Sequence, residues 1–266
     1  MSQTVAKNFS GDSLTHNEMT AIEKELENIK ELTVGMMELV KEQLKRSCNA
    51  LMQHDTRLAS DILRYELRVN ELELTIEKAC EQVIALHQPV ATELRFILAV
   101  FKAVSELERL ADHVEGIARV LLDKEVPFNP ETLAQLETEA MYSESEQMFD
   151  DIINSLNDQD TDLARTVFKR DKFLNKTFKR STQNILEQLR DTSDGTTDSS
   201  ELLRLFQVLY RLERIGDLLT NVAELIIFYL EAVVIKHKKK RKRVEKKIAE
   251  ISHNHDEDGA EQNPKD

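Results

Sequence analysis

Two stretches of this chain match each other at a constant spacing of 105 positions. The hexapeptide Leu-Glu-Arg-Leu-Ala-Asp at 107–112 returns as Leu-Glu-Arg-Ile-Gly-Asp at 212–217. The same offset aligns other positions without a gap: Asp55 and Thr56 with Asp160 and Thr161, Leu58 and Ala59 with Leu163 and Ala164, Glu66 with Asp171, Asn70 with Asn175, and Phe101 with Phe206. Such a repeat predicts two copies of one structural unit packed together. Residues that both copies keep are the first candidates for a shared function.

The composition favours helices over sheet. The 266 residues include only 6 Gly and 4 Pro, while the strong helix formers Leu, Glu, Lys, Arg and Ala are abundant. Each Pro, at 89, 127, 130 and 264, falls between segments whose apolar residues recur every three or four positions. We therefore predict neither a parallel sheet nor a Rossmann unit.

Apolar periodicity predicts three helices in each copy. They cover 17–53, 56–87 and 91–123 in the first copy, and 131–157, 160–190 and 199–250 in the second. The connections at 54–55 and 87–90 allow only tight reversals, so neighbouring helices run antiparallel. The predicted fold is all-α, with two tandem antiparallel three-helix bundles in an elongated six-helix protein. Its parts are an N-terminal extension (1–16), the first bundle (17–123), a linker (124–130), the second bundle (131–235), and a basic helical extension with a disordered acidic tail (236–266).

Cysteine usage and hydropathy indicate a cytoplasmic protein. Cys48 and Cys80 are the only cysteines, and residues 1–16 contain no apolar core of a secretion signal. The most apolar stretch, 222–235, is interrupted by two Glu residues and is too short to span a bilayer. The formal net charge of −13 disfavours general binding of nucleic acid.

Carboxylates recur on the third predicted helix of each copy. Glu108 and Glu213 fall where the periodic pattern leads us to expect an apolar residue, and Asp112 and Asp217 follow one turn later on the same face. Like charges four positions apart repel by a few tenths of a kcal/mol. We therefore expect something positive to neutralise them.

The antiparallel register brings further oxygen-bearing side chains to the same place. A reversal near residue 89 places Asn70 opposite Glu108, and Glu66 opposite Asp112. The set in the second copy comprises Asp171, Asn175, Glu213 and Asp217, joined along the helix by Asn221 and Glu224. Carboxylate and amide oxygens suit hard divalent cations. The sequence thus predicts divalent metal sites for Mg²⁺, Mn²⁺, iron or zinc.

Two other interpretations remain open. Arg109 and Arg214 accompany the carboxylates and would pair with them in a structural bundle without metal. A carboxylate-bridged di-metal enzyme needs Glu-x-x-His pairs on two inward-facing helices, and the only such pair here is Glu250 with His253. Neither a nucleophile elbow nor a Gly-rich phosphate loop occurs. We therefore predict that the protein is not an enzyme.

These motifs resemble those of the PhoU family of bacterial and archaeal phosphate-signalling proteins. The similar runs are His-Gln-Pro-Val-Ala-Thr-Glu-Leu-Arg at 87–95 and the two hexapeptides, the second followed by Asn221 and Glu224. The resemblance covers about 17–234. It implies two three-helix bundles, each with an E(D)xxxD motif that binds a multinuclear metal cluster at the surface.

The resemblance also implies a function. Members of the family are non-enzymatic negative regulators that contact the phosphate-specific ABC transporter, including its ATPase subunit, and the sensor histidine kinase PhoR. They hold the phosphate regulon off when phosphate is plentiful. The apolar surface of such long helices further predicts a homodimer.

The chain departs from the family pattern in two places. Gly116 stands where the second copy has Asn221, which predicts fewer ions in the first cluster. A basic segment also follows the second bundle, comprising Lys236, Lys238, Lys239, Lys240, Arg241, Lys242 and Arg243. It is a solvated extension, a contact for anionic lipid beside a transporter, or a contact for nucleic acid; among the binding roles, membrane proximity fits best, at about 1 kcal/mol per basic residue.

Overall fold

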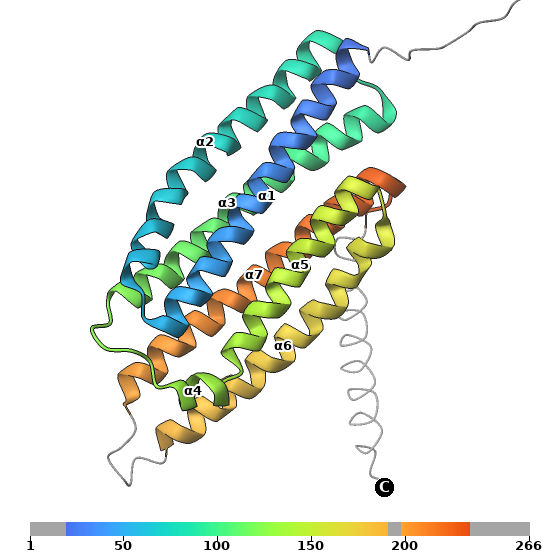
Figure 1. Ribbon diagram of the computed structural model, residues 1–266. Coiled ribbons are helices and arrows are strands. Elements are labelled where there is room, and N and C mark those ends of the chain that lie inside the picture. The colour runs from blue at the N-terminus through green and yellow to red at the C-terminus, as the bar shows by residue number, and fades with distance from the viewer. Residues whose placement is uncertain (1–19, 191–197, 235–266) are drawn as a thin grey trace, which may run out of the picture.

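The computed structural model describes residues 20–190 and 198–234, which form seven helices and no strand. The helices are α1 (Ala21–Gln53), α2 (Thr56–His87), α3 (Ala91–Leu122), α4 (Pro130–Gln135), α5 (Thr138–Asp158), α6 (Thr161–Arg190) and α7 (Ser199–Glu231). The all-α prediction is confirmed (Figure 1). None of these helices is long and apolar enough to cross a membrane. The basic segment from Lys236 to Arg243 lies outside the described residues.

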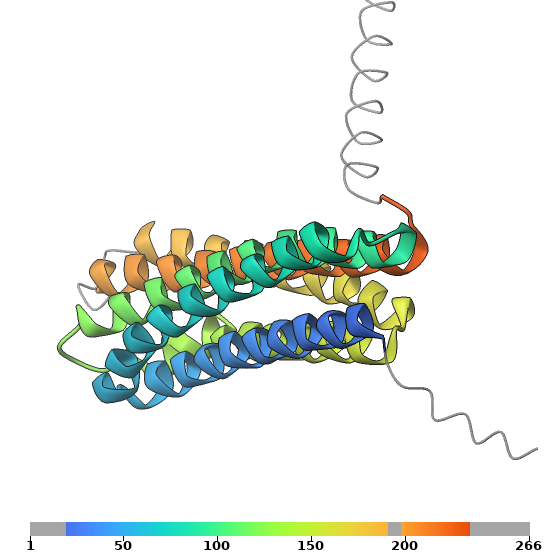
Figure 2. The same ribbon diagram turned by 90° about the horizontal axis from the view of Figure 1, so that it is seen from above.

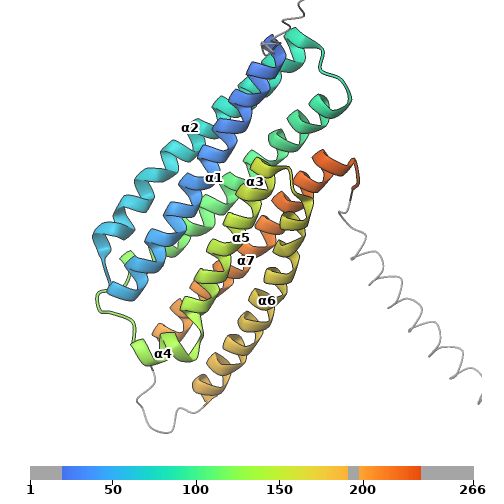
Figure 3. The same ribbon diagram turned by 45° about the vertical axis from the view of Figure 1, so that its right-hand side comes forward.

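The helices form two three-helix bundles side by side. In the first, α1, α2 and α3 pack together; in the second, α5, α6 and α7 do so, and α4 precedes α5. The bundles meet where α3 packs along α7 and α1 along α5, with their long axes aligned (Figure 2). The outer helices α2 and α6 lie on opposite sides of the molecule (Figure 3). A helix of 33 residues, such as α1, is about 50 Å long, so the molecule is elongated as predicted.

The Asp-Thr pairs repeated in the sequence begin the second helix of each bundle. Asp55 and Asp160 each accept hydrogen bonds from the backbone N–H groups two and three residues later, at 2.9 and 3.1 Å for Asp55 and 2.8 and 3.4 Å for Asp160. These N–H groups have no partner within a helix, so a carboxylate at this position satisfies them. The preceding residues, His54 and Gln159, adopt left-handed φ values of 52° and 54°. Both tight reversals therefore consist of a residue with left-handed φ followed by a capping Asp.

The prediction of one continuous helix over 131–157 is wrong. The helix breaks between α4 and α5, where Glu137 has a φ of 52°. Arg180 of α6 donates hydrogen bonds of 3.0 and 2.8 Å to the Glu137 carboxylate, and the Ser181 hydroxyl donates to the Leu136 carbonyl at 2.7 Å. These contacts come from a helix more than 40 residues away in the chain, so the local apolar pattern does not reveal them. The described chain thus has seven helices rather than six.

The predicted linker is anchored by a buried ion pair. The Lys124 ammonium lies 3.0 Å from the Glu201 carboxylate, and both side chains are buried. Glu201 also accepts a hydrogen bond of 2.9 Å from the Asn129 backbone N–H. The connection between the bundles is therefore held against the first turn of α7.

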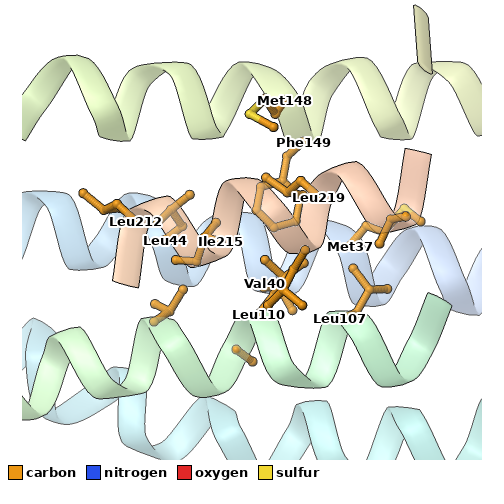
Figure 4. Close-up of a cluster of buried hydrophobic side chains, with 14 of the residues drawn as sticks. Met37, Val40, Leu44, Leu107, Leu110, Met148, Phe149, Leu212, Ile215 and Leu219 are labelled. Carbon is orange, nitrogen blue, oxygen red and sulfur yellow. The ribbon is translucent and has the colours of Figure 1, made fainter. Parts of the chain in front are cut away.

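A single hydrophobic core runs through both bundles. Figure 4 shows buried side chains from four helices in one cluster: Met37, Val40 and Leu44 of α1, Leu107 and Leu110 of α3, Met148 and Phe149 of α5, and Leu212, Ile215 and Leu219 of α7. The bundles therefore share apolar surface rather than forming separate cores.

Candidate metal centre

Three carboxylates converge on the outer surface between α2 and α3. Glu66 of α2 and Asp112 and Glu115 of α3 each place an oxygen so that these atoms lie within 4.8 Å of one another. Glu66 and Glu115 are half-buried and Asp112 is exposed. The antiparallel register predicts Glu66 opposite Asp112, and the structure confirms that proximity.

Two oxygen atoms beside this group are buried without a partner. Neither Oε2 of Glu66 nor Oδ1 of Asn70 has a hydrogen bond to any described residue. Burial of an unsatisfied acceptor costs about 1–3 kcal/mol, so such atoms normally face a partner. Both are hard oxygen donors one helical turn apart on α2. This donor set fits a hard divalent cation.

The charges around the cluster repel one another. Burial is the main cause that raises the pKa of each of four carboxyl groups: Glu66, Glu73, Glu108 and Asp112. Neighbouring carboxylates raise these pKa values further: Asp112 acts on Glu66, Glu73 and Glu108, and Glu115 acts on Glu66 and Asp112. Three contacts oppose the shifts: a hydrogen bond with Asn70 lowers the pKa of Glu66, Arg109 lowers those of Glu108 and Asp112, and Arg211 lowers that of Asp112. A bound cation would oppose all of these shifts, because it favours the ionised carboxylate.

Sequence reasoning missed Glu73 and Glu115. It selected residues shared by the two copies, and the second copy has Phe178 and Thr220 at the equivalent positions. A different signal was present, because acidic or amide residues recur at intervals of four and then three on both helices: Glu66, Asn70 and Glu73 on α2, and Glu108, Asp112 and Glu115 on α3. Such spacing places each set on one helix face.

The prediction that Glu108 and Glu213 occupy the apolar seam is wrong. On α3 the seam runs through Leu107, Leu110 and Ala111, all fully buried, while Glu108 is half-buried beside it. Glu213 is likewise half-buried. The buried face of α3 is wider than one stripe because this helix packs against α1, α2 and α7. The carboxylates therefore stand at its edge, where solvent and ions have access.

The equivalent residues of the second copy contain their own cation. Arg214 donates a hydrogen bond of 2.5 Å to Asp217, and the Asn175 amide donates one of 3.0 Å to Asp171. Burial is the main cause that raises the pKa of Glu213; Asp217 and Asp171 add to the shift and Arg214 opposes it. Within the described residues, Glu66, Asp112 and Glu115 are the only convergent group of acidic, His or Cys side chains. The two copies are thus unequal.

A glycine lets α6 and α7 approach each other at the second site. A Cβ atom on Gly216 would lie 2.7 Å from Cδ1 of Leu174 and 3.7 Å from Oδ1 of Asp171. The distance to Leu174 is shorter than the van der Waals contact distance between two carbon atoms. A larger residue at 216 would therefore require the buried Leu174 side chain to move.

The difference between Gly116 and Asn221 arises from packing between the bundles. The Asn221 amide donates a hydrogen bond of 3.1 Å to Glu106 of α3, so this side chain engages the other bundle. A Cβ atom on Gly116 would overlap the guanidinium of Arg211, which occupies that space. Since Arg211 is the repeat equivalent of Glu106, the two contacts are counterparts across α3 and α7. Gly116 thus makes room for Arg211, and Glu224 lies half-buried a turn beyond Asn221.

Comparison with known proteins accounts for the repeat. The PhoU domain model matches residues 33–121 and 138–226, one match in each bundle. This chain belongs to the PhoU family. The family resemblance seen in the sequence is therefore confirmed.

Relatives and solved structures match most of this chain. The "Phosphate-specific transport system accessory protein PhoU" of Serratia marcescens is 32% identical over 213 residues, which cover 80% of this chain and 86% of the relative. A PhoU homolog from Aquifex aeolicus is 31% identical over 80% of this chain and 95% of its own length. The crystal structure of PhoU from Pseudomonas aeruginosa is 28% identical, with a TM-score of 0.72 over 79% of this chain and 99% of that one. A PhoU structure from Streptococcus pneumoniae, 23% identical with a TM-score of 0.73, supports the fold. The PhoU relatives bear the names of accessory proteins, not of enzymes.

Proposed function

We propose that this chain is a cytoplasmic, non-enzymatic accessory protein of the phosphate-specific transport system and a negative regulator of phosphate-starvation genes. Its partners would be the phosphate-specific ABC transporter, including the ATPase subunit, and a PhoR-type sensor histidine kinase. Family membership and the names of the relatives support the transport role. Negative regulation, coupling to the kinase and a homodimeric state go beyond these names and are part of the proposal.

We further propose that the PhoU fold here carries divalent cations. The observation that carries this proposal is the pair of buried, unpartnered oxygens of Glu66 and Asn70 beside converging carboxylates. Glu66, Asn70, Glu108 and Asp112 would hold a cation at the first site, assisted by the newly found Glu73 and Glu115. Oxygen donors alone favour Mg²⁺ or Mn²⁺, with iron or zinc as alternatives.

The second site would bind a cation more weakly. Its residues are Asp171, Asn175, Glu213 and Asp217, and Arg214 already neutralises Asp217. A cation that binds both Glu213 and Asp217 would compete with the Arg214 guanidinium for Asp217. Asn221 and Glu224 would extend this site further along α7, although the Asn221 amide also donates a hydrogen bond to Glu106 of the first bundle.

Metal content tests the two sites separately. We expect elemental analysis of purified Glu108→Ala and Glu213→Ala variants to show a stepwise loss of bound metal, with the larger loss in Glu108→Ala. The thermal shift on addition of Mn²⁺ should fall in the same order. Glu71→Ala is the matched control, because Glu71 is an exposed carboxylate on α2. If neither site variant differs from wild type, the carboxylates form a salt-bridge network and the protein is a structural bundle without metal.

A deletion strain tests the regulatory role. Loss of this gene should raise alkaline phosphatase activity in medium rich in phosphate, and the wild-type gene should restore repression. Complementation with the Glu108→Ala gene distinguishes a sensory metal from a structural one. If the metal is sensory, the variant protein should fold but fail to repress alkaline phosphatase. Unchanged phosphatase activity in the deletion strain would refute the regulatory proposal.

A further inference from the structure

A cleft of about 360 Å³ opens between the bundles, at the end where α1 and α3 begin and α5 and α7 end. Three apolar side chains line it: Leu26 of α1, Phe96 of α3 and Tyr229 of α7. The rings of Phe96 and Tyr229 meet edge to face, with centroids 5.1 Å apart. The cleft thus has an aromatic lining shared by both bundles.

The polar lining of this cleft is mainly acidic. Glu23 and Glu27 of α1 are exposed, and Glu93 of α3 is half-buried. Lys30 is the only basic residue that lines the cleft, and its ammonium is directed at the Asn157 carbonyl 3.5 Å away. Glu23 and Glu93 also accept hydrogen bonds at the starts of their own helices, from Thr20 and Val90. The lining still holds three carboxylates and one amine, which favours a cationic occupant.

A cationic segment of the same chain follows α7, the helix whose Tyr229 lines the cleft. Tyr229 lies two residues before the end of α7, and Ala232 has a left-handed φ of 56° that ends the helix. The sequence continues through Ile235 into Lys236–Arg243, where every residue except His237 is Lys or Arg. The basic residues thus begin seven positions after Tyr229, which itself lines the cleft.

We propose that the basic segment 236–243 docks into this cleft of its own chain. Its lysines pair with Glu23, Glu27 and Glu93, and Ile235 adds apolar contact at Phe96 and Tyr229. Docking in cis withholds the positive charge from other anionic surfaces and bridges the first bundle to the end of the second. Release of the segment would expose both an acidic cleft and a basic segment.

Zero-length cross-linking with a carbodiimide tests the docked state in the full-length protein. The reagent joins a lysine amine to a carboxylate only where the two are in contact. We expect amide links from lysines of 236–243 to Glu27, Glu23 or Glu93, within monomers and suppressed at about 0.5 M salt because exposed ion pairs are screened. Glu25, exposed on the same helix but outside the cleft, serves as the internal control. Links that are absent, that reach Glu25 equally, or that occur only between monomers would overturn docking in cis.

A charge reversal provides a second measurement. Glu27→Lys should speed tryptic cleavage within 236–243 by about threefold, the effect of losing one or two exposed ion pairs. Glu25→Lys carries the same charge change and should leave the cleavage rate at the wild-type value. Glu27→Lys should also bind phosphatidylglycerol vesicles more tightly than Glu25→Lys, because the segment is released. Equal cleavage and equal vesicle binding in the two variants would mean that the segment is already free to meet lipid, and would refute the proposal.

Discussion

Glu66 is the residue that most clearly lowers the stability of the metal-free protein. Its Oε2 atom is buried without a partner, and burial, the main cause, raises the pKa of the carboxyl group above its ordinary value of 4.5. The ionised form is thus disfavoured in the folded protein, so the associated stability is present at acidic pH and is lost as pH rises through the folded-state pKa. In protein freed of metal with a chelator, Glu66→Gln should therefore raise the melting temperature at pH 7 by an amount on the order of 2 °C.

Differential scanning fluorimetry at two pH values checks this residue. The gain of Glu66→Gln should disappear near pH 4, where the wild-type carboxyl is protonated, and the variant should lose most of the Mn²⁺-dependent shift. Glu71→Gln removes the same charge from an exposed position of α2 and is the control. An equal gain in both variants would point to general charge repulsion instead of the buried oxygen.

Helix α7 depends on a glycine for its close contact with α6. Because a Cβ atom on Gly216 would meet the buried Leu174 at 2.7 Å, Gly216→Ala should destabilise the protein by about 1–3 kcal/mol through overpacking. Gly35 of α1 is exposed, and a Cβ atom added there would meet nothing within 4 Å beyond its chain neighbours and the backbone of its own helix. Gly35→Ala should therefore stabilise the protein by about 0.5–1 kcal/mol, the usual helix propensity difference.

Urea denaturation of this pair separates packing from propensity. Both substitutions add one methyl group within a helix, so a difference in midpoint measures the space available to it. The midpoint should fall for Gly216→Ala and rise for Gly35→Ala at constant slope. A rise for both would show that the Leu174 side chain moves aside without cost.

The whole molecule should unfold as one unit, because its core runs through both bundles. Leu110 of α3 is fully buried in the cluster that includes Ile215 and Leu219 of α7. Leu110→Ala should cost about 2–5 kcal/mol, and hydrogen exchange should show the outer helices α2 and α6 losing protection together.

A surface substitution serves as the control for this prediction. Leu67 is 68% exposed, so Leu67→Ala should change stability by no more than about 0.5 kcal/mol. If α6 keeps its protection in Leu110→Ala while α2 loses it, the bundles are independent folding units despite their shared core.

Local sequence patterns determined most of the helices and the approach of Glu66 to Asp112. Apolar periodicity located α2 at 56–87, as the structure has it, and the repeated Asp-Thr pairs marked the capped starts of α2 and α6. The short reversal at 87–90 then set the register that brings Glu66 to Asp112. These features follow from hydrogen bonds and side-chain spacing within a few residues of one another, so the sequence alone contains them.

Tertiary contacts decided what the local pattern left open. Arg180 and Ser181 of α6 hold the break before α5, and the guanidinium of Arg211 of α7 occupies the space beside Gly116. Local spacing puts Glu115 on one face of α3 with Glu108 and Asp112, but only the packing of α2 against α3 brings it to Glu66. Each outcome depends on which side chain of a distant helix lies at the point of contact. The packing of whole helices decides this, and no short stretch of neighbouring residues specifies it.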